Sequence, residues 1–216
     1  MSREDFKKMK KIQSKRELNK VQKKASFIDA AERLFMQKGF ENTSIDEVAK
    51  EAGLTKRTLY QYFTSKEDLF YAVATKGARL LLSAYEEAMK RGNNVLEKIR
   101  LGNKAYLQFY KDYLGMFRLM NYTPATLQNS EESPHYREIR VLDGIRMQYF
   151  MDFVASGHSD GSINPNLDIR KAIFFAFFAP FSLLYTVSSM SMWDQLELDE
   201  NEFLQFSFDL FADALK

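Results

Sequence analysis

The chain has 216 residues, of which 45% are apolar or aromatic and 28% are charged, and its formal net charge is +2. This apolar fraction suffices for one large or two small cores and excludes disorder over most of the length. Cysteine is absent, which excludes disulfides and thiolate metal sites. The two histidines, His135 and His158, stand beside loop-like sequence, so we expect them to be solvated and expect no metal, no cofactor and no catalytic centre.

Positive charge is concentrated near the amino terminus. Residues 1–24 hold ten Lys and Arg against three acidic residues, residues 25–66 hold six of each, and residues 67–216 are more acidic than basic. The surplus predicts a polyanionic partner for a basic extension at 1–24, and the alternative is a solvated arm. The extension lacks the apolar run of a signal peptide, so we expect a cytoplasmic protein.

Helical spacing dominates the rest of the chain, and alternating strand patterns are hard to find, so the predicted fold class is all-α. The first apolar stripe consists of Phe27, Ile28, Ala31, Leu34 and Phe35. Gly39 follows this stripe and is suited to the positive φ of a helix end. The first helix is therefore predicted to end near Lys38.

Capping patterns mark the next helices. Ser44 and Glu47 form the capping-box pattern S-x-x-E at the start of a second helix, which Gly53 stops. Thr55 is suited to cap a third helix of about eight residues. Ser65 and Asp68 form a second S-x-x-[DE] pattern at the start of a fourth helix.

Longer helices are predicted after Ser65. The fourth helix runs from Lys66 to about Lys90 and, at about 1.5 Å per residue, is long enough to join two domains. The sequence "SGHSDGSINPN" at 156–166 is predicted to be a loop. The remaining helices are predicted at about 95–113, 136–155, 167–190 and 200–214.

The second and third helices, separated by "AGLT", describe a helix-turn-helix. Leu59 and Phe63 are expected to anchor the third helix. Arg57 is suited to a guanine edge, Gln61 to adenine, and Thr58 to a base or a thymine methyl group. Residues better suited to phosphate oxygens are Lys56, Tyr60, Tyr62 and Lys66. The alternative is the polar, solvated face of an ordinary three-helix core.

Residues 27–74, "FIDAAERLFMQKGFENTSIDEVAKEAGLTKRTLYQYFTSKEDLFYAVA", strongly resemble the DNA-binding domain of the tetracycline-repressor (TetR) family. The shared motifs are A-x-x-L-F-x-x-x-G-[FY]-x-x-T-[ST], I-A/V-A-x-x-A-G and L-Y-x-Y-F-x-S-K-E-x-L. The resemblance implies an all-helical, usually homodimeric transcription regulator, most often a repressor, that is not an enzyme. It assigns DNA binding to residues 25–72, and ligand binding and dimerisation to 73–216.

The resemblance also implies a set of DNA-contacting residues, carried over by position. The set is Thr43, Ser44, Thr55, Lys56, Arg57, Thr58, Tyr60, Gln61, Tyr62 and Lys66. Arg57 stands where many members have a small residue, so the base preference of relatives does not transfer. The basic extension is longer than usual in the family, and we expect it to lie on phosphates or in the minor groove.

Aromatic and methionine side chains are dense in the second domain. Facing one another, they are predicted to line a pocket for an apolar or planar ligand, and the alternative is an ordinary core. The predicted ligand-binding residues are Tyr106, Phe109, Tyr110, Tyr113, Phe117, Met120, Met147, Phe150 and Met151.

Residues 172–193 carry no charge and are long enough to span a bilayer. Pro180 near the middle and the polar second half favour a buried helix. The family resemblance assigns the last two helices to a two-fold dimer interface. Its predicted residues are Phe174, Phe178, Phe181, Phe203, Phe206 and Leu210.

Together these patterns predict a homodimeric repressor that binds a palindromic double-stranded operator and is released by a small apolar or aromatic effector. The alternatives to this function are an enzyme, for which no catalytic motif is present; an architectural DNA-binding protein; and a regulator tethered to a membrane.

Overall fold

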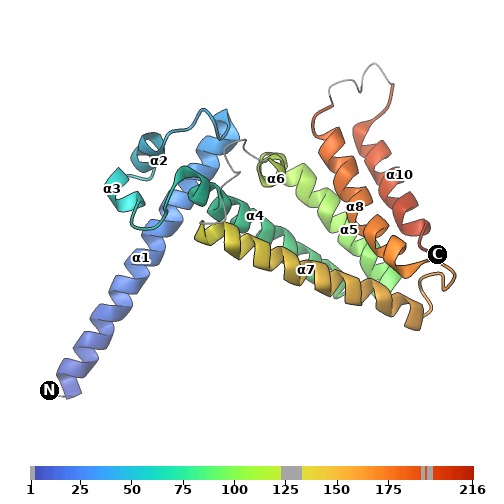
Figure 1. Ribbon diagram of the computed structural model, residues 1–216, viewed down its shortest axis with the longest axis horizontal. Coiled ribbons are helices and arrows are strands. Elements are labelled where there is room, and N and C mark those ends of the chain that lie inside the picture. Colours follow the sequence, from blue (N-terminus) through green and yellow to red (C-terminus); the bar gives the residue numbers. More distant parts are fainter. Residues whose placement is uncertain (1–2, 123–132, 191–192, 194–196) are drawn as a thin grey trace. The chain divides into compact units, whose positions relative to one another are not determined.

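The computed structural model describes residues 3–122, 133–190, 193 and 197–216, and for residues 3–14, 145, 146 and 149 it describes the backbone alone. All regular elements in these ranges are α-helices, which confirms the all-α class (Figure 1). The chain forms two compact units. Unit 1 comprises residues 1–74 and 123–137, and unit 2 comprises residues 75–122 and 138–216.

Unit 1 begins with a long helix followed by two short ones. Helix α1 spans Arg3–Lys38 and ends at the predicted residue, where Gly39 has φ 83°. Helix α2 spans Ile45–Glu51 between Ser44 and Gly53, as predicted, and Gly53 has φ 67°. Both glycines therefore occupy the left-handed region that favours glycine at helix ends.

Helix α3 spans Lys56–Leu59 and is shorter than the eight residues predicted. The chain continues in tight turns, in which the backbone N–H groups of Gln61 and Tyr62 donate to the carbonyl groups of Thr58 and Leu59. Such i→i+3 bonds narrow the last turn of a helix. The predicted surface is thus one α-helical turn followed by turn residues that reach Tyr62.

Aromatic packing holds these helices together. Phe27 of α1 is fully buried and meets Phe63 edge-on, with ring centroids 6.4 Å apart. Phe35, Phe40 and Phe70 form a second cluster in the same unit, with centroid separations of 5.1–6.1 Å. Since Leu59 is also fully buried, α3 is fixed to the core by one side of its surface and exposes the other.

Two helices pass from one unit to the other. Helix α4 spans Lys66–Met89, close to its predicted bounds, and belongs to unit 1 up to Ala74. Helix α7 spans Pro134–Ser159, and its first residues, 134–137, belong to unit 1. The sequence had placed these residues in the second domain.

The remaining helices of unit 2 are α5 (Val95–Asp112), α6 (Leu114–Asn121), α8 (Ile169–Val187) and α10 (Glu200–Asp213). Their core combines Leu96 and Ile99 of α5 with Val154, Ile173 and Ala212 from later helices. By length and apolar composition, α8 is the one helix within the described residues that would suffice to cross a membrane.

Helix α7 corrects two sequence predictions. It continues to Ser159, so the predicted loop 156–166 is helical at its start, and Gly161, with φ 72°, follows the helix end. Both histidines lie in this helix. His135 is buried, and its ring meets Phe63 at 5.4 Å, so it is not a solvated loop residue.

Candidate nucleic-acid interface

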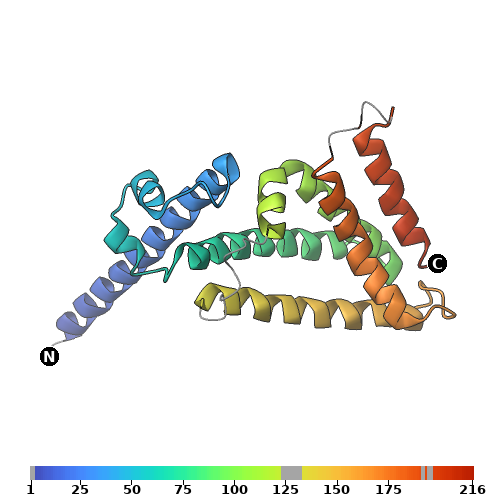
Figure 2. The same ribbon diagram turned by 45° about the horizontal axis from the view of Figure 1, so that its top comes forward.

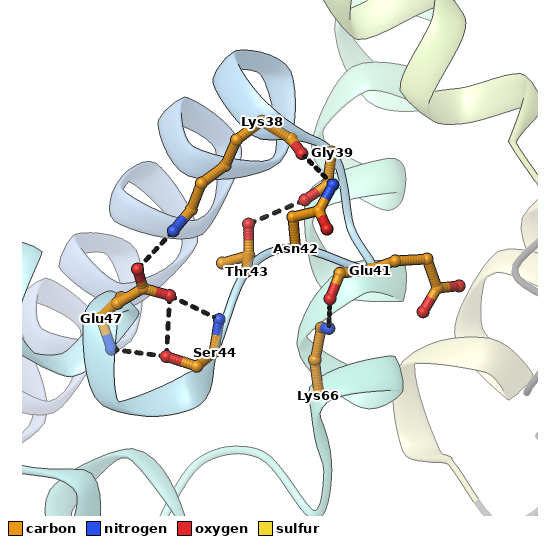
Figure 3. A network of polar contacts seen from close by, with 8 residues as sticks. All are labelled: Lys38, Gly39, Glu41, Asn42, Thr43, Ser44, Glu47 and Lys66. Carbon is orange, nitrogen blue, oxygen red and sulfur yellow. Dashed lines mark hydrogen bonds and ion pairs between the residues drawn. The ribbon is translucent and has the colours of Figure 1, made fainter.

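The start of α2 is fixed by a complete capping box (Figure 3). The Glu47 backbone N–H donates to Ser44 Oγ at 3.3 Å, and the Ser44 backbone N–H donates to Glu47 Oε2 at 2.8 Å. The ammonium group of Lys38 also donates to this carboxylate. That bond and those from Ser44 lower the pKa of Glu47 to about 2, so the carboxylate is ionised at neutral pH and connects α1 to α2.

A compact turn carries the chain from α2 to α3. The Leu54 backbone N–H donates to the Ala49 carbonyl at 2.9 Å, and Thr55 then caps α3 as predicted. The Thr58 backbone N–H donates to Thr55 Oγ1 at 3.2 Å, and the two threonine hydroxyls are 2.8 Å apart. A side-chain cap of this kind contributes about 1 kcal/mol to helix stability.

The exposed side of α3 and of the turn that follows it presents several predicted base-reading and phosphate-binding groups. Arg57 and Gln61 are exposed, and Tyr60 is 50% exposed, while Thr58 is half-buried. Arg57 forms no ion pair with any side chain that the structure describes. Its guanidinium donors are therefore available for an external acceptor, and the chemistry of this surface matches the base edges of a major groove.

Two predicted phosphate-binding lysines are held by neighbours. Lys56 forms an ion pair of 2.8 Å with Asp46 of α2, which raises the pKa of Lys56. The Lys66 ammonium lies 4.2 Å from the centroid of Phe40 and donates to the Glu41 carbonyl at 3.3 Å (Figure 3). Both cations thus have defined positions at the edge of the helix-turn-helix.

Thr43 is the exception among the predicted DNA contacts. It is 2% exposed, and its hydroxyl donates to the Gly39 carbonyl at 2.8 Å (Figure 3). Because its side chain supports the turn from inside, Thr43 is removed from the candidate interface. Ser44 remains exposed, whereas Tyr62 is half-buried against Phe27, with ring centroids 6.1 Å apart.

The predicted ligand-binding residues fall into two groups in unit 2. In the first, Tyr106 and Tyr110 of α5 contact Phe117 of α6, with centroids 6.1 and 5.2 Å apart, and all three are buried. In the second, Phe150 contacts Phe177 at 5.5 Å and packs with Met151 against the core of unit 2. A pocket between the two groups stays a prediction.

Other members of the predicted ligand set differ in exposure. Phe109 is buried beside Tyr113, at 5.3 Å between centroids, and Tyr113 is exposed. Met120 and Met147 are half-buried. The Tyr110 hydroxyl donates to Glu200 at 3.1 Å, and burial, with the charge of Glu200, raises the pKa of Tyr110 to about 12. This tyrosine therefore joins α5 to α10.

The predicted dimer-interface residues form an apolar surface on α8 and α10. Phe174 and Phe178 stack with an interplanar angle of 4°, and Phe174 is 54% exposed. Phe206 and Leu210 are 64% and 54% exposed. Phe181 and Phe203 are half-buried.

Comparison with known proteins adds a family match to this geometry. The profile of the family described as "Bacterial regulatory proteins, tetR family" matches residues 27–73, the stretch that carries α2 and α3.

Two curated relatives match more of the chain. The HTH-type transcriptional activator FasR of Mycolicibacterium smegmatis is 27% identical over 48% of this chain, and the match spans only 47% of FasR. The fatty acid metabolism regulator protein of Bacillus subtilis is 25% identical over 67% of this chain and 73% of its own. Both are regulators by name, and neither is described as an enzyme.

Solved structures share the fold over most of the chain. A TetR family transcription regulator from Marinobacter aquaeolei superposes with a TM-score of 0.66 at 22% identity, covering 92% of this chain and 98% of the other. The FadR regulator of Bacillus subtilis, solved with stearoyl-CoA, gives a TM-score of 0.66 at 19% identity, covering 89% and 99%. At these identities the likeness establishes the fold.

Proposed function

We propose that this chain, which belongs to the tetR family of bacterial regulatory proteins, is a cytoplasmic, homodimeric transcription repressor that an apolar small molecule releases from its operator. One observation carries the proposal. The capped α3 and the turn that follows it are anchored by the buried Leu59 and Phe63 and expose Arg57 and Gln61. A rigid element that presents a bidentate donor and an amide is the arrangement used to read base edges.

Sequence reading is assigned to Arg57, Thr58 and Gln61. Arg57 would donate to guanine O6 and N7, and Gln61 would pair with adenine N6 and N7. Lys56, Lys66 and Tyr60 would contact phosphates and set the register. Because phosphate contacts carry little sequence information, the specificity of this surface depends on the first three side chains.

The exposed apolar surface of α8 and α10 supports dimerisation. Large apolar side chains are in contact with water on this surface, namely Phe174, Phe178, Phe206 and Leu210. A second copy of the chain would cover them. A two-fold dimer presents α3 twice, so we propose a palindromic operator with half-sites about one helical turn, or a multiple of it, apart. Covering α8 in this way also supports a protein that needs no membrane.

The effector is proposed to be a fatty acyl compound. A named relative regulates fatty acid metabolism, and the similar FadR structure contains stearoyl-CoA. The aromatic residues of α5 and α6, with Met147 and Met151 of α7, offer apolar surface of the right chemistry. In one form of the dimer, the spacing of the two α3 copies would not match the operator half-sites. A ligand that prefers this form would weaken DNA binding by about 1–3 kcal/mol.

The test begins with selection of duplexes from a random pool by the full chain. We expect enrichment of a palindrome, and Arg57→Ala with Gln61→Ala should lose about 1–3 kcal/mol of discrimination at each contacted base. Arg140→Ala with Gln108→Ala, two exposed positions of unit 2, is the matched control and should bind normally. Undiminished selectivity in the α3 variant would remove the basis of the proposal.

Two further measurements test the remaining parts. Stearoyl-CoA added to the protein–DNA complex should weaken binding several-fold to a hundredfold, and binding of this ligand without any change in DNA affinity would contradict the effector assignment. Since FasR is described as an activator, a promoter–reporter assay must establish the direction of regulation. Higher expression without the protein is the result expected of a repressor.

A further inference from the structure

The side of α1 that packs on the helix-turn-helix core continues beyond that core as a row of positive charges. Four cations lie within about 60° of Phe27 around the helix axis, at 100° per residue. They are Arg16, Lys20, Lys23 and Lys24, and together they are called the basic stripe. Phe27 contacts Tyr62, so the stripe is aligned with the end of the candidate interface.

The basic stripe is free to bind a partner. Arg16, Lys20 and Lys23 are exposed and Lys24 is half-buried. None of the four forms an ion pair or a side-chain hydrogen bond with any side chain that the structure describes. Figures 1 and 2 both show α1 extending well past α2 and α3, so these helices leave the amino-terminal part of α1 uncovered.

The opposite side of the helix has different chemistry. Leu18 and Val21 are 57% and 62% exposed, and they lie about 180° and 120° away from Phe27. From Arg16 to Lys24, therefore, every cation lies on the side that faces the core. Lys15 and the cations before it lie about 100° or more from Phe27, so the stripe is confined to the part of α1 next to the core.

We infer that the basic stripe binds the phosphate backbone of duplex DNA that flanks the bases contacted by α3. The inference rests on the proposed function and extends its interface. Lys24 lies about 4.5 Å along the axis from Phe27, so the stripe begins beside Tyr62. The stripe is about 12 Å long, and one DNA strand carries three or four phosphates over that axial length.

The helical form of the extension decides which part of the duplex it contacts. An α-helix with side chains is about 10–12 Å wide, and the minor groove is about 6 Å wide, so α1 does not fit the groove. Ammonium groups on a helix outside the groove contact phosphate oxygens, which carry no base code. The stripe thus adds affinity that is sensitive to salt and leaves base preference unchanged.

The test compares the full chain with the variant Arg16→Gln, Lys20→Gln, Lys23→Gln and Lys24→Gln, because glutamine keeps a similar helix propensity. The probe is the duplex that the full chain enriches from a random pool, with long flanks. The plot of log K against log salt should be less steep by about 0.9 for each phosphate that the variant no longer neutralises. We expect the variant to lose contacts to about three or four phosphates per chain. Unchanged steepness would overturn the inference.

Two controls separate charge from position. Lys104→Gln, Lys111→Gln, Lys171→Gln and Lys216→Gln removes the same charge from exposed positions of unit 2 and should keep the original steepness. The variant Lys20→Arg, Lys23→Arg and Lys24→Arg keeps the stripe charged and should also keep the original steepness. An equal reduction of steepness in the unit 2 variant would show a general charge effect and would overturn the inference.

Shortening the flanks of the duplex gives a second, independent measurement. With short flanks the steepness for the full chain should fall to that of the stripe variant, and the steepness for the variant should fall no further. A variant that still responds to the flanks would overturn the inference. A full chain that binds no duplex would overturn the proposed function as well, whereas sequence-selective binding with equal salt dependence overturns the stripe alone.

Discussion

His135 Nδ1 lies 2.8 Å from the carboxylate of Asp68, although 67 positions separate the two residues. The same oxygen accepts hydrogen bonds from Ser133 Oγ at 2.6 Å and the His135 backbone N–H at 3.2 Å, and the second oxygen accepts one from the Thr64 backbone N–H at 3.0 Å. Burial alone would raise the pKa of Asp68, but these bonds, His135 first, hold it well below its usual range. Asp68 is thus ionised, and Nδ1 is the donor.

Asp68→Asn should destabilise the protein by about 3 kcal/mol at pH 7, because buried donors lose their charged acceptor. The low pKa of the folded state means that the carboxylate stabilises the fold above its unfolded pKa of about 3.9 and stops doing so as pH falls through the folded pKa. The difference between the two proteins should therefore shrink in acid. Urea unfolding at several pH values measures it.

Asp152→Asn is the control for this substitution. Asp152 is exposed and accepts a bond from Gln148 within the same helix, so its loss should change the free energy of unfolding by less than about 0.5 kcal/mol. If Asp68→Asn unfolds like the parent at pH 7, or if the difference stays constant down to about pH 2, the role assigned to the carboxylate is wrong.

Replacing each of two helical glycines in unit 2 by alanine should change the free energy of unfolding in opposite directions. A Cβ added at Gly102 would lie 2.9 Å from two ring atoms of Tyr85, and one added at Gly144 would meet no atom within 4 Å among the residues that the structure describes. Gly102→Ala should therefore cost about 1–3 kcal/mol through overpacking, while Gly144→Ala should gain up to about 1 kcal/mol from helix propensity. Thermal unfolding of both variants measures the two changes in stability. A change in the same direction for both variants would contradict this packing.

The ion pair between Asp46 and Lys56 should restrain DNA binding. Asp46→Asn removes a negative charge near the expected phosphates and releases the Lys56 ammonium, so it should tighten binding, whereas Lys56→Gln should weaken it. Because the pair is exposed and screened by solvent, each variant should leave the free energy of unfolding almost unchanged. Titration with an enriched duplex tests both, and weaker binding by Asp46→Asn would mean that this carboxylate positions Lys56 productively.

Charged residues at the apolar surface of α8 and α10 should produce monomers that remain folded. Phe178 and Phe206 are exposed in the single chain, so Phe178→Asp with Phe206→Asp should preserve the helical circular dichroism while it disrupts association. Val141→Asp, at an exposed apolar position on α7, is the control and should keep the parental molar mass. Light scattering gives the masses, and an unchanged dimer in the double variant would place the interface elsewhere.

The sequence alone determined the end of α1, both ends of α2, the start of α3 and thus the helix-turn-helix, because the groups responsible act over three or four residues. The patterns at Ser44 and Thr55 predicted caps that the structure confirms, and Gly39 and Gly53 predicted positive φ. The exposed character of Arg57 followed from the helical spacing around Leu59.

Only the tertiary structure decided which polar residues of unit 1 are internal. The S-x-x-[DE] pattern predicted a helix start at Ser65, and the Asp68 backbone N–H does donate to Ser65 Oγ at 3.1 Å. The pattern did not predict that the Asp68 carboxylate binds Thr64, Ser133 and His135. Thr43 likewise proved to be buried. A local pattern fixes a helix start, but the partner of a buried carboxylate depends on which distant segment packs against it, and no spacing of nearby residues encodes that choice.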